Sequence, residues 1–245
     1  MMIQTENDQK ILAIDIGGSH IKATLLNEAG VFLKDYEKLP TPLPATPGKV
    51  LDVIKQLSQS FQGYDKIAAG FPGFIKDGIV KTAPNLGSDQ WIDFNLQKKL
   101  AEVLGKPALA INDADLQGIS VVSGTGIEMM ITLGTGFGTA LLRDGILMPH
   151  LEMAHHPVSG KKTYDEYVGQ EELSRIGEKK WNKRIKKVIE ILKVVFNYDR
   201  LYISGGNADL IKFKLDKNIT IASNKDGIKG GAKLWKQQFK SETEK

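Results

Sequence analysis

The chain has 245 residues, of which 41% are hydrophobic and 25% are charged, and its formal net charge is +4. These values suit a soluble globular protein with one large domain or two ordinary ones. Cysteine is absent, which excludes disulfides and cysteine-ligated metal centres. No long apolar run predicts a membrane span, and residues 1–10 are too polar for a signal peptide, so we expect a cytoplasmic protein.

The first half of the chain predicts strands and helices in alternation. The opening strands form a β-meander, with a turn at Gly17-Gly18. In chain order, we expect strands at Ile11–Ile16, Ile21–Leu26 and Val31–Lys38, a helix opening at Thr46-Pro47, a strand at Lys66–Phe71, a hairpin at Ile75–Thr82, a helix at Phe94–Leu104 and a strand at Ala108–Ile111. This alternation predicts an α/β layer.

The opening pattern recurs in the second half. Glu128–Leu133 predicts a strand, and a glycine-rich turn and a second strand follow it. When this segment is laid on the first without gaps, Ile131 falls on Ile14 and Gly134 on Gly17. Two unrelated hairpins are the alternative, but we favour two related domains.

The rest of the chain predicts mainly helices. Apolar residues at helical spacing mark a long helix over Trp181–Phe196, and a strand at Leu201–Ser204 leads into Gly205-Gly206. A last helix is expected at Gly227–Phe239. We place the domain boundary near Asn112-Asp113, which gives domains 1–112 and 113–245, with the final helix, 227–240, able to pack back on the first domain.

Glycine-rich turns are the first chemical signal. Backbone N–H groups approach phosphate oxygens only where no Cβ intervenes. Such turns occur at Asp15-Ile16-Gly17-Gly18-Ser19, at Gly134-Thr135-Gly136 and at Gly205-Gly206. Neither the Walker pattern nor the dinucleotide fingerprint is present. Three turns, two of them in register, favour a phosphate-binding protein.

Two polar clusters are the second signal. Asn112-Asp113 lies between a predicted strand and a predicted helix, where it either caps the helix or presents a carboxylate to a ligand. As chemistry, Asp113 is able to accept a proton from a hydroxyl that attacks phosphorus. Glu152 and His155 would share one face of a helix, and without other His or Cys clusters they fit hydroxyl binding better than metal ligation.

These motifs resemble the ROK family within the hexokinase and actin-like superfamily, and the resemblance covers nearly the whole chain. Asp15–Ser19 and Leu133–Ala140 resemble its two phosphate motifs. Gly70–Gly73, Asn85, Asn112-Asp113 and Glu152-x-x-His155 resemble its sugar site in the same order. Within the family, the proline-rich stretch Pro40–Pro47 resembles that of the polyphosphate glucokinases, which also lack the zinc-binding cysteines of other members. The family fold implies two RNase H-like α/β domains, each opening with a β-meander that carries a phosphate turn, with a cleft between them.

The resemblance also implies roles. Asp113 would be the general base on the 6-hydroxyl of a hexose, most simply glucose. The sugar would be bound by Gly73, Asn85, Asn112, Asp113, Glu152, His155 and Glu166. The phosphoryl donor, polyphosphate or ATP, would lie against Asp15, Gly17, Gly18, Ser19, Lys22, Gly134, Thr135, Gly136, Gly205 and Gly206. Asp15 would hold Mg²⁺, usually through water. Zinc, nucleic acid and membrane partners are not expected, and a homodimer is expected by analogy.

The chain departs from these glucokinases at three positions. His20 and Ala23 replace glycines beside the first turn, and Ala154 replaces a glycine between Glu152 and His155. These changes put the choice of sugar and donor in question more than the fold. The basic run at residues 179–187 is either a solvated helix face or a track for polyphosphate.

Three rival functions stay open. The chain could be an ATP-dependent kinase of another hexose or of an N-acylhexosamine. It could also be a non-catalytic sugar-binding regulator, but ROK repressors carry an amino-terminal DNA-reading module, and the first strand here begins near Ile11. A degenerate kinase is the third, and the presence of Asp113 and of both phosphate turns argues against it.

Overall fold

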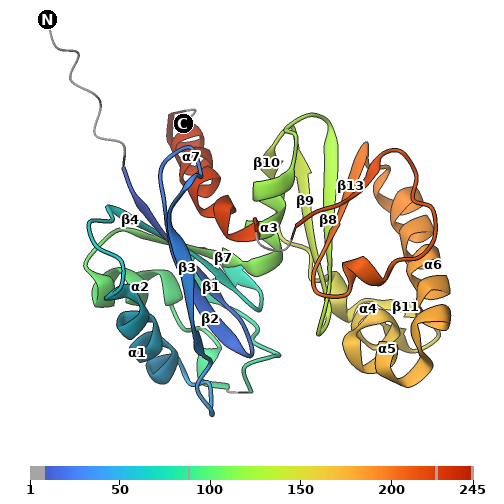
Figure 1. Ribbon diagram of the computed structural model, residues 1–245, viewed down its shortest axis with the longest axis horizontal. Coiled ribbons are helices and arrows are strands. Elements are labelled where there is room, and N and C mark those ends of the chain that lie inside the picture. Colours follow the sequence, from blue (N-terminus) through green and yellow to red (C-terminus); the bar gives the residue numbers. More distant parts are fainter. Residues whose placement is uncertain (1–8, 88, 224–225, 244–245) are drawn as a thin grey trace, which may run out of the picture. The chain divides into compact units, whose positions relative to one another are not determined.

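The structure is a computed structural model that describes residues 9–87, 89–223 and 226–243. The described chain divides into two compact units. The first extends to Leu116 and resumes at Ile228, and the second spans Gln117–Gly227. The sequence predicted a boundary near Asn112-Asp113 and a return of the last helix. Each unit is built on its own five-stranded sheet (Figure 1).

The sheet of the first unit has the strand order β3-β2-β1-β4-β7. The first three strands form an antiparallel meander, whereas β4 and β7 run parallel to β1. The elements of this unit are β1 (Ile11–Ile16), β2 (His20–Leu26), β3 (Phe32–Pro40), α1 (Pro47–Ser58), β4 (Lys66–Phe71), β5 (Ile75–Lys76), β6 (Ile79–Val80), η1 (Asp89–Trp91), α2 (Leu96–Leu104), β7 (Ala108–Asn112) and α7 (Gly230–Thr243). Helix α3 (Asp113–Val121) leaves β7 and continues into the second unit.

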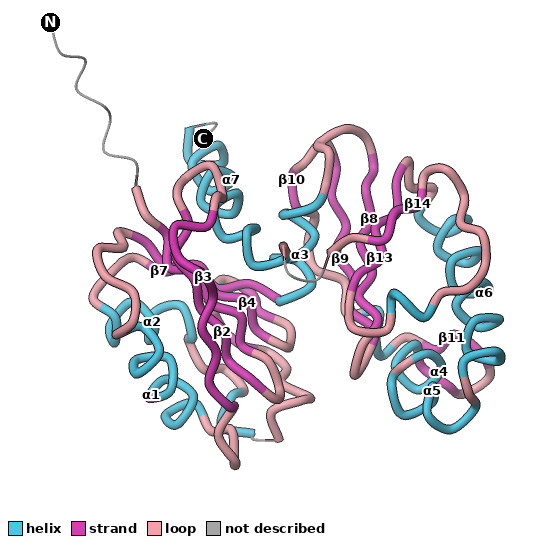
Figure 2. The backbone as a smooth tube through the Cα atoms, in the orientation of Figure 1, coloured by secondary structure: helices cyan, strands magenta, loops and turns pink. Residues whose placement is uncertain are grey.

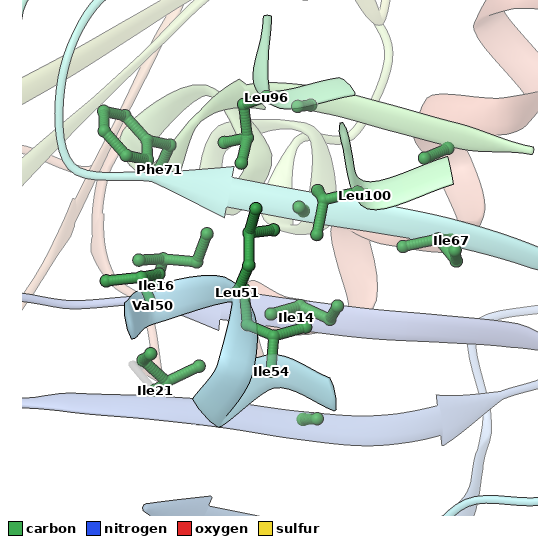
Figure 3. Close-up of a cluster of buried hydrophobic side chains, with 14 of the residues drawn as sticks. Ile14, Ile16, Ile21, Val50, Leu51, Ile54, Ile67, Phe71, Leu96 and Leu100 are labelled. Atoms are coloured by element: carbon green, nitrogen blue, oxygen red, sulfur yellow. The ribbon is translucent and has the colours of Figure 1, made fainter. Parts of the chain in front are cut away.

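Alternation along the strands sends large apolar side chains to one face of this sheet. Ile14 and Ile16 of β1 pack there with Ile67 and Phe71 of β4, because side chains two residues apart lie on the same face. Figure 3 shows α1 and α2 covering this face, with Ile54 and Leu100 among the side chains in contact with it. This cluster is the core of the first unit.

Helix α7 covers the opposite face. A Cβ at Gly231 would lie 3.2 Å from Ala13 Cβ and 3.0 Å from Ala68 Cβ, so small residues on both sides allow a close approach. Trp235 Nε1 donates to the Ile67 carbonyl oxygen at 3.1 Å. The carboxyl-terminal helix therefore completes the first unit.

The sheet of the second unit has the order β10-β9-β8-β13-β14, again a meander followed by parallel strands (Figure 2). Its apolar core lies between the sheet and helices α4, α5 and α6. The elements of this unit are β8 (Ile127–Leu133), β9 (Phe137–Arg143), β10 (Ile146–Leu147), η2 (Met153–His155), β11 (Pro157–Ser159), β12 (Lys162–Thr163), α4 (Tyr164–Val168), α5 (Gln170–Ile176), α6 (Glu178–Phe196), β13 (Arg200–Ser204), η3 (Ala208–Leu210) and β14 (Ile219–Ile221). The turn η4 (Gly227–Lys229) precedes α7.

The two sheets share one strand order, as expected for related domains. Their first hairpins differ in length, however. Ile16 pairs with Ile21, so four residues lie between them, whereas Leu133 pairs with Phe137 with three between. The gapless alignment therefore holds for β1 and β8 but is offset by one residue in the ladder that follows.

Most predicted elements are confirmed, with shifted ends. The third strand begins one residue late and runs to Pro40, and helix α2 begins at Leu96 because the Asn95 side chain caps it, accepting from Lys98 N–H. Glu152 to His155 forms a short 3₁₀ turn rather than an α-helix. Among the described residues, no helix is both long and apolar enough to cross a membrane. The cleft stays a prediction.

Candidate active site

The first glycine turn joins β1 to β2. The Gly17 N–H donates to the His20 carbonyl oxygen at 3.0 Å, and a Cβ at Gly17 would lie 2.9 Å from that oxygen, so the turn itself requires this glycine. Thr41 holds the turn, because its hydroxyl donates to the Gly17 carbonyl oxygen at 2.6 Å and its N–H to that of Ser19 at 2.9 Å. Gly18, Ser19 and His20 are exposed.

Asp15 and Lys22 lie opposite each other in the ladder beside this turn. The Lys22 ammonium donates to Asp15 Oδ2 at 3.3 Å, and both side chains are partly exposed. On its other side, Asp15 pairs with Gly70 of β4. The carboxyl end of β1 therefore presents a carboxylate and an ammonium next to the glycine turn.

Asn112 ends β7 and caps α3. Its side-chain oxygen accepts from the N–H groups of Ala114 at 2.8 Å and Asp115 at 3.2 Å, and its side-chain amide donates to the Gly73 carbonyl oxygen at 3.1 Å. Asn112 is buried. The capping interpretation is therefore correct for Asn112, which also anchors Gly73.

Asp113 is the first residue of α3, and its Oδ1 accepts from the Ala114 N–H at 2.8 Å. Burial and the negative charges of Asp15 and Asp115 raise the pKa of Asp113 to about 7, against the opposing effect of its backbone hydrogen bonds. Gly70 lies beneath it, since a Cβ there would be 3.3 Å from Asp113 Cα. A carboxyl that titrates near neutrality is a candidate general base.

Two other predicted sugar ligands lie in the first unit. A Cβ at Gly73 would lie 2.0 Å from the Thr82 carbonyl oxygen, so packing against Thr82 excludes any other residue there. Asn85 lies beside the first glycine turn, because a Cβ at Gly18 would be 3.4 Å from the Asn85 carbonyl oxygen. The fold thus brings Gly73 to Asn112, and Asn85 to the predicted donor turn.

The second glycine turn, between β8 and β9, neighbours the Gly205-Gly206 turn. A Cβ at Gly205 would lie 2.2 Å from the Leu133 carbonyl oxygen, and φ is +96° at this position. The same oxygen accepts from the Asn207 N–H at 2.9 Å. By contrast, a Cβ at Gly134 or Gly206 would meet nothing within 4 Å. Local packing therefore explains Gly205, whereas Gly134 and Gly206 leave open space beside the backbone, as a phosphate-binding turn requires.

Asp165 supports the second turn, and our sequence reasoning did not single it out. Its Oδ1 accepts from the Phe137 N–H at 2.6 Å. A Cβ at Gly136 would lie 2.7 Å from the same oxygen. Thr135 is exposed, and its carbonyl oxygen accepts from the Gln170 N–H at 3.2 Å. A carboxylate thus fixes the side of the turn where β9 begins.

The charges of the remaining predicted sugar ligands act on the pKa of Asp165. Burial raises the pKa of Asp165; Glu152 and Glu166 add to this rise, whereas the Phe137 hydrogen bond and the positive charge of His155 oppose it. His155 is exposed at the end of η2. Glu152, His155 and Glu166 are therefore brought together around one carboxyl group.

Glu166 also has a local structural role. Its Oε2 accepts from the Thr163 N–H at 2.9 Å, and the Thr163 hydroxyl accepts from the Glu166 N–H at 3.3 Å. This reciprocal pair is the capping box of α4. The spacing Thr163-x-x-Glu166 was readable in the sequence and would have located this helix.

The described residues contain no group of three or more His, Asp or Glu side chains placed to hold a metal ion. Mg²⁺ needs fewer protein ligands, because it keeps several waters and is commonly held by one or two carboxylates together with substrate phosphates. The partly exposed Asp15 carboxylate beside the first glycine turn fits that donor set.

Comparison with known proteins identifies the family. The sequence profile described as the ROK family matches residues 11–157, more than half of the chain. The polyphosphate glucokinase of Mycobacterium tuberculosis is 32% identical over 228 residues, covering 88% of this chain and 83% of the relative. The chain belongs to the ROK family. Over a shorter stretch of 144 residues, 56% of this chain and 48% of the relative, the N-acetylmannosamine kinase of Escherichia coli is 33% identical.

Solved structures of the ROK family confirm the expected fold. The inorganic polyphosphate/ATP-glucomannokinase of an Arthrobacter strain superimposes with a TM-score of 0.86 at 26% identity, covering 94% of this chain and all of the other. This ROK chain is therefore confirmed as two α/β units of the actin-like type.

Proposed function

We propose that this ROK family chain is a sugar kinase that transfers a phosphoryl group from polyphosphate or ATP to the 6-hydroxyl of glucose. Polyphosphate glucokinase and polyphosphate/ATP-glucomannokinase are the relatives that support this activity. The observation that carries the proposal is Asp113, a carboxyl group at the carboxyl end of a parallel strand with its pKa raised to about 7.

Asp113 acts as the general base in this proposal. A base with a pKa near the working pH combines a substantial ionised fraction with enough basicity to take a proton. The Ala114 N–H holds the carboxylate at the first turn of α3, so its second oxygen is the one to accept the proton of the attacking hydroxyl. Phosphoryl transfer needs little more covalent chemistry from the protein.

The sugar ring is bound by Asn85, Asn112, Glu152 and His155. Asn112 already uses its oxygen to cap α3 and one N–H to anchor Gly73, so its second side-chain N–H is the group that would donate to a sugar hydroxyl. Glu166 uses one carboxylate oxygen in the capping box and has the other for a hydroxyl. These partly committed side chains are preorganised for binding.

The phosphoryl donor lies against the glycine turns at Gly17–Ser19, Gly134–Gly136 and Gly205-Gly206. The open space beside Gly134 and Gly206 supports this assignment, because the fold alone does not require glycine there. Lys22 contributes a positive charge to the donor oxygens. Asp15 would hold Mg²⁺ through water, and the bound ion would supply further neutralisation of phosphate charge.

Phosphorylation of an N-acylhexosamine is the second candidate. It is favoured by the N-acetylmannosamine kinase relative, although the similarity covers only 56% of this chain. The two candidate acceptors differ in size, because an N-acylhexosamine carries an N-acyl group where glucose has a hydroxyl. A site for the N-acylhexosamine therefore needs additional room. Cytoplasmic location and a homodimer stay predictions.

The test is sugar phosphate formation by the purified protein with Mg²⁺, with ATP and polyphosphate as donors and glucose and N-acetylmannosamine as acceptors. We expect glucose 6-phosphate to be the main product. Asp113→Asn should abolish turnover while glucose binding is kept. Asp52→Asn, at an exposed position on α1, serves as the matched control. Turnover that survives in Asp113→Asn would show that the base is wrong, and silence with every sugar and donor would refute the kinase proposal.

A further inference from the structure

Helix α6 carries an excess of positive charge on one side. Its 19 residues include seven lysines and arginines and only two acids, Glu178 and Glu190. Because residues three and four apart are neighbours on a helix, four of the cations form a continuous row, which we call the basic stripe. The basic stripe consists of Lys180, Lys183, Arg184 and Lys187. The apolar face of α6, with Trp181 and Ile185, is buried in the core.

A buried carboxylate holds one member of the basic stripe, Arg184. Glu172 of α5 is only 6% exposed, and it accepts from Lys162 Nζ at 2.6 Å, from Arg175 Nε at 2.6 Å and from Arg184. The Arg175 hydrogen bonds, followed by those of Lys162 and Arg184, hold the pKa of Glu172 well below its usual range. Arg184 also stacks on Tyr167, 4.4 Å from the ring centroid. Three cations therefore surround a single negative charge.

The rest of the basic stripe lacks compensating acids. Among the described residues, Lys180, Lys183 and Lys187 make no ion pair with a carboxylate, and all three are exposed. Lys193 and Lys186 differ, since Lys193 pairs with Asp216 at 2.8 Å and Lys186 adds its charge to the lowering of the pKa of Asp216. Lys179, which directly precedes the basic stripe, is exposed like its lysines. The uncompensated charge is therefore concentrated on the side of α6 that borders Arg184 and α5.

This side is connected to the second glycine turn. The Gln170 N–H donates to the carbonyl oxygens of Gly134 at 3.0 Å and of Thr135 at 3.2 Å, and Gln170 is the first residue of α5. Helix α5 has seven residues, which corresponds to about 10 Å. Near its end, Arg175 joins the cations around Glu172. Positive charge thus begins one short helix away from the predicted donor turn and continues along α6.

We propose that the basic stripe binds the distal phosphates of an inorganic polyphosphate chain while a terminal phosphate lies at the Gly134 turn. This inference rests on the proposed kinase function and names its donor. A polymer with one charge or more at each phosphate matches a row in which Arg184 is held by Glu172 and three exposed lysines carry no ion pair among the described residues. Binding of such a polymer releases counterions. ATP is too short to extend from the turn along α6, so the basic stripe distinguishes the polymer from the nucleotide.

The test compares two triple variants. Lys180→Gln/Lys183→Gln/Lys187→Gln removes three charges from the basic stripe. Lys49→Gln/Lys55→Gln/Lys106→Gln removes three exposed charges from the first unit and is the control. We expect the KM for long-chain polyphosphate to rise about ten- to hundredfold in the basic-stripe variant alone, since each exposed contact contributes modestly. The KM values for ATP and tripolyphosphate should stay within about twofold of wild type. The salt slope of polyphosphate binding should fall by about 2, because three phosphate contacts are lost.

Direct binding separates failure of this inference from failure of the kinase function. If wild type makes no sugar phosphate but binds long-chain polyphosphate, and the basic-stripe variant loses that binding, the basic stripe stands and the kinase proposal fails. An unchanged KM for long-chain polyphosphate would overturn the inference and show that the basic side of α6 is only a solvent-exposed surface. An equal rise in the KM for ATP would also overturn it. Equally strong competition by single-stranded DNA of equal charge would overturn it too, because the basic stripe would then be a general polyanion site.

Discussion

Replacing Gly134 by alanine should weaken donor binding without weakening the fold. A Cβ at this position meets nothing within 4 Å, and φ lies outside the left-handed range, so the backbone accepts alanine. Gly→Ala at a compatible position stabilises by about 0.4–1 kcal/mol through the unfolded chain. The new methyl group would occupy the space where a phosphate approaches the turn. Losing one charge-assisted hydrogen bond costs about 1.5–3 kcal/mol, which raises the KM for the donor about ten- to hundredfold.

The measurement pairs urea unfolding with donor KM values for Gly134→Ala, Gly206→Ala and Gly205→Ala. Gly205 is the control, because φ is +96° and its Cβ would lie 2.2 Å from the Leu133 carbonyl oxygen. We expect Gly205→Ala to lose about 1–3 kcal/mol or more of unfolding free energy. The other two should unfold at the same urea concentration or a higher one, with a raised KM. If Gly134→Ala binds the donor as wild type does, the reasoning that open space marks a phosphate site is refuted.

Two further predictions concern titration. Because the pKa of Asp113 is raised, its contribution to stability is full below pH 3.8 and is lost as pH rises to about 7. Asp113→Asn should therefore gain stability over wild type across that interval and hold the gain above it, as thermal unfolding would record. The kcat/KM of wild type should rise with pH and level off above about 7. The lowered pKa of Glu172 makes its contribution full above pH 4.5, so Glu172→Gln should cost about 2–4 kcal/mol in urea unfolding at pH 7. This difference should shrink progressively as pH falls below 4.5, and no cost at pH 7 would contradict the role of Glu172.

Local sequence patterns predicted the glycine turns and the repeated meander. The turn at Gly17-Gly18 and the turn at Gly134–Gly136 each lie between strands that are adjacent in the chain, so apolar runs and glycines were enough to place them. The hairpin lengths were not predictable to one residue, since an offset of one residue leaves the apolar pattern of β1 and β8 unchanged. The apolar pattern also does not determine where strands and helices end. Helix α2, for example, begins after its Asn95 cap, whereas the pattern predicted a start at Phe94.

Long-range packing determined the rest of the site. Asp165 supports the second turn across 28 residues of chain, through its hydrogen bond to the Phe137 N–H, and a lone Asp in a helical segment gives no signal of that contact. The cations around Glu172 come from β12, α5 and α6, and only the packing of those elements brings them together. Glu166 differs, because its capping box was visible in the sequence although the resemblance suggested a sugar ligand.

A glycine of the neighbouring strand lies beside Asp113, whose pKa is raised first by burial and then by the charge of Asp15. Register places Asp15 of β1 opposite Gly70 of β4, and Gly70 lies beneath Asp113 at the start of α3. Gly70 therefore adds no side chain next to the two carboxyl groups, and the charge of Asp15 adds to burial in raising the pKa of Asp113. A Cβ at Gly70 would lie 3.0 Å from Leu116 Cδ2 and 3.3 Å from Asp113 Cα, so a larger residue would press on the side chain of Leu116 and on the backbone at Asp113. The strand register and this glycine together place the candidate base where its pKa suits proton transfer near neutral pH.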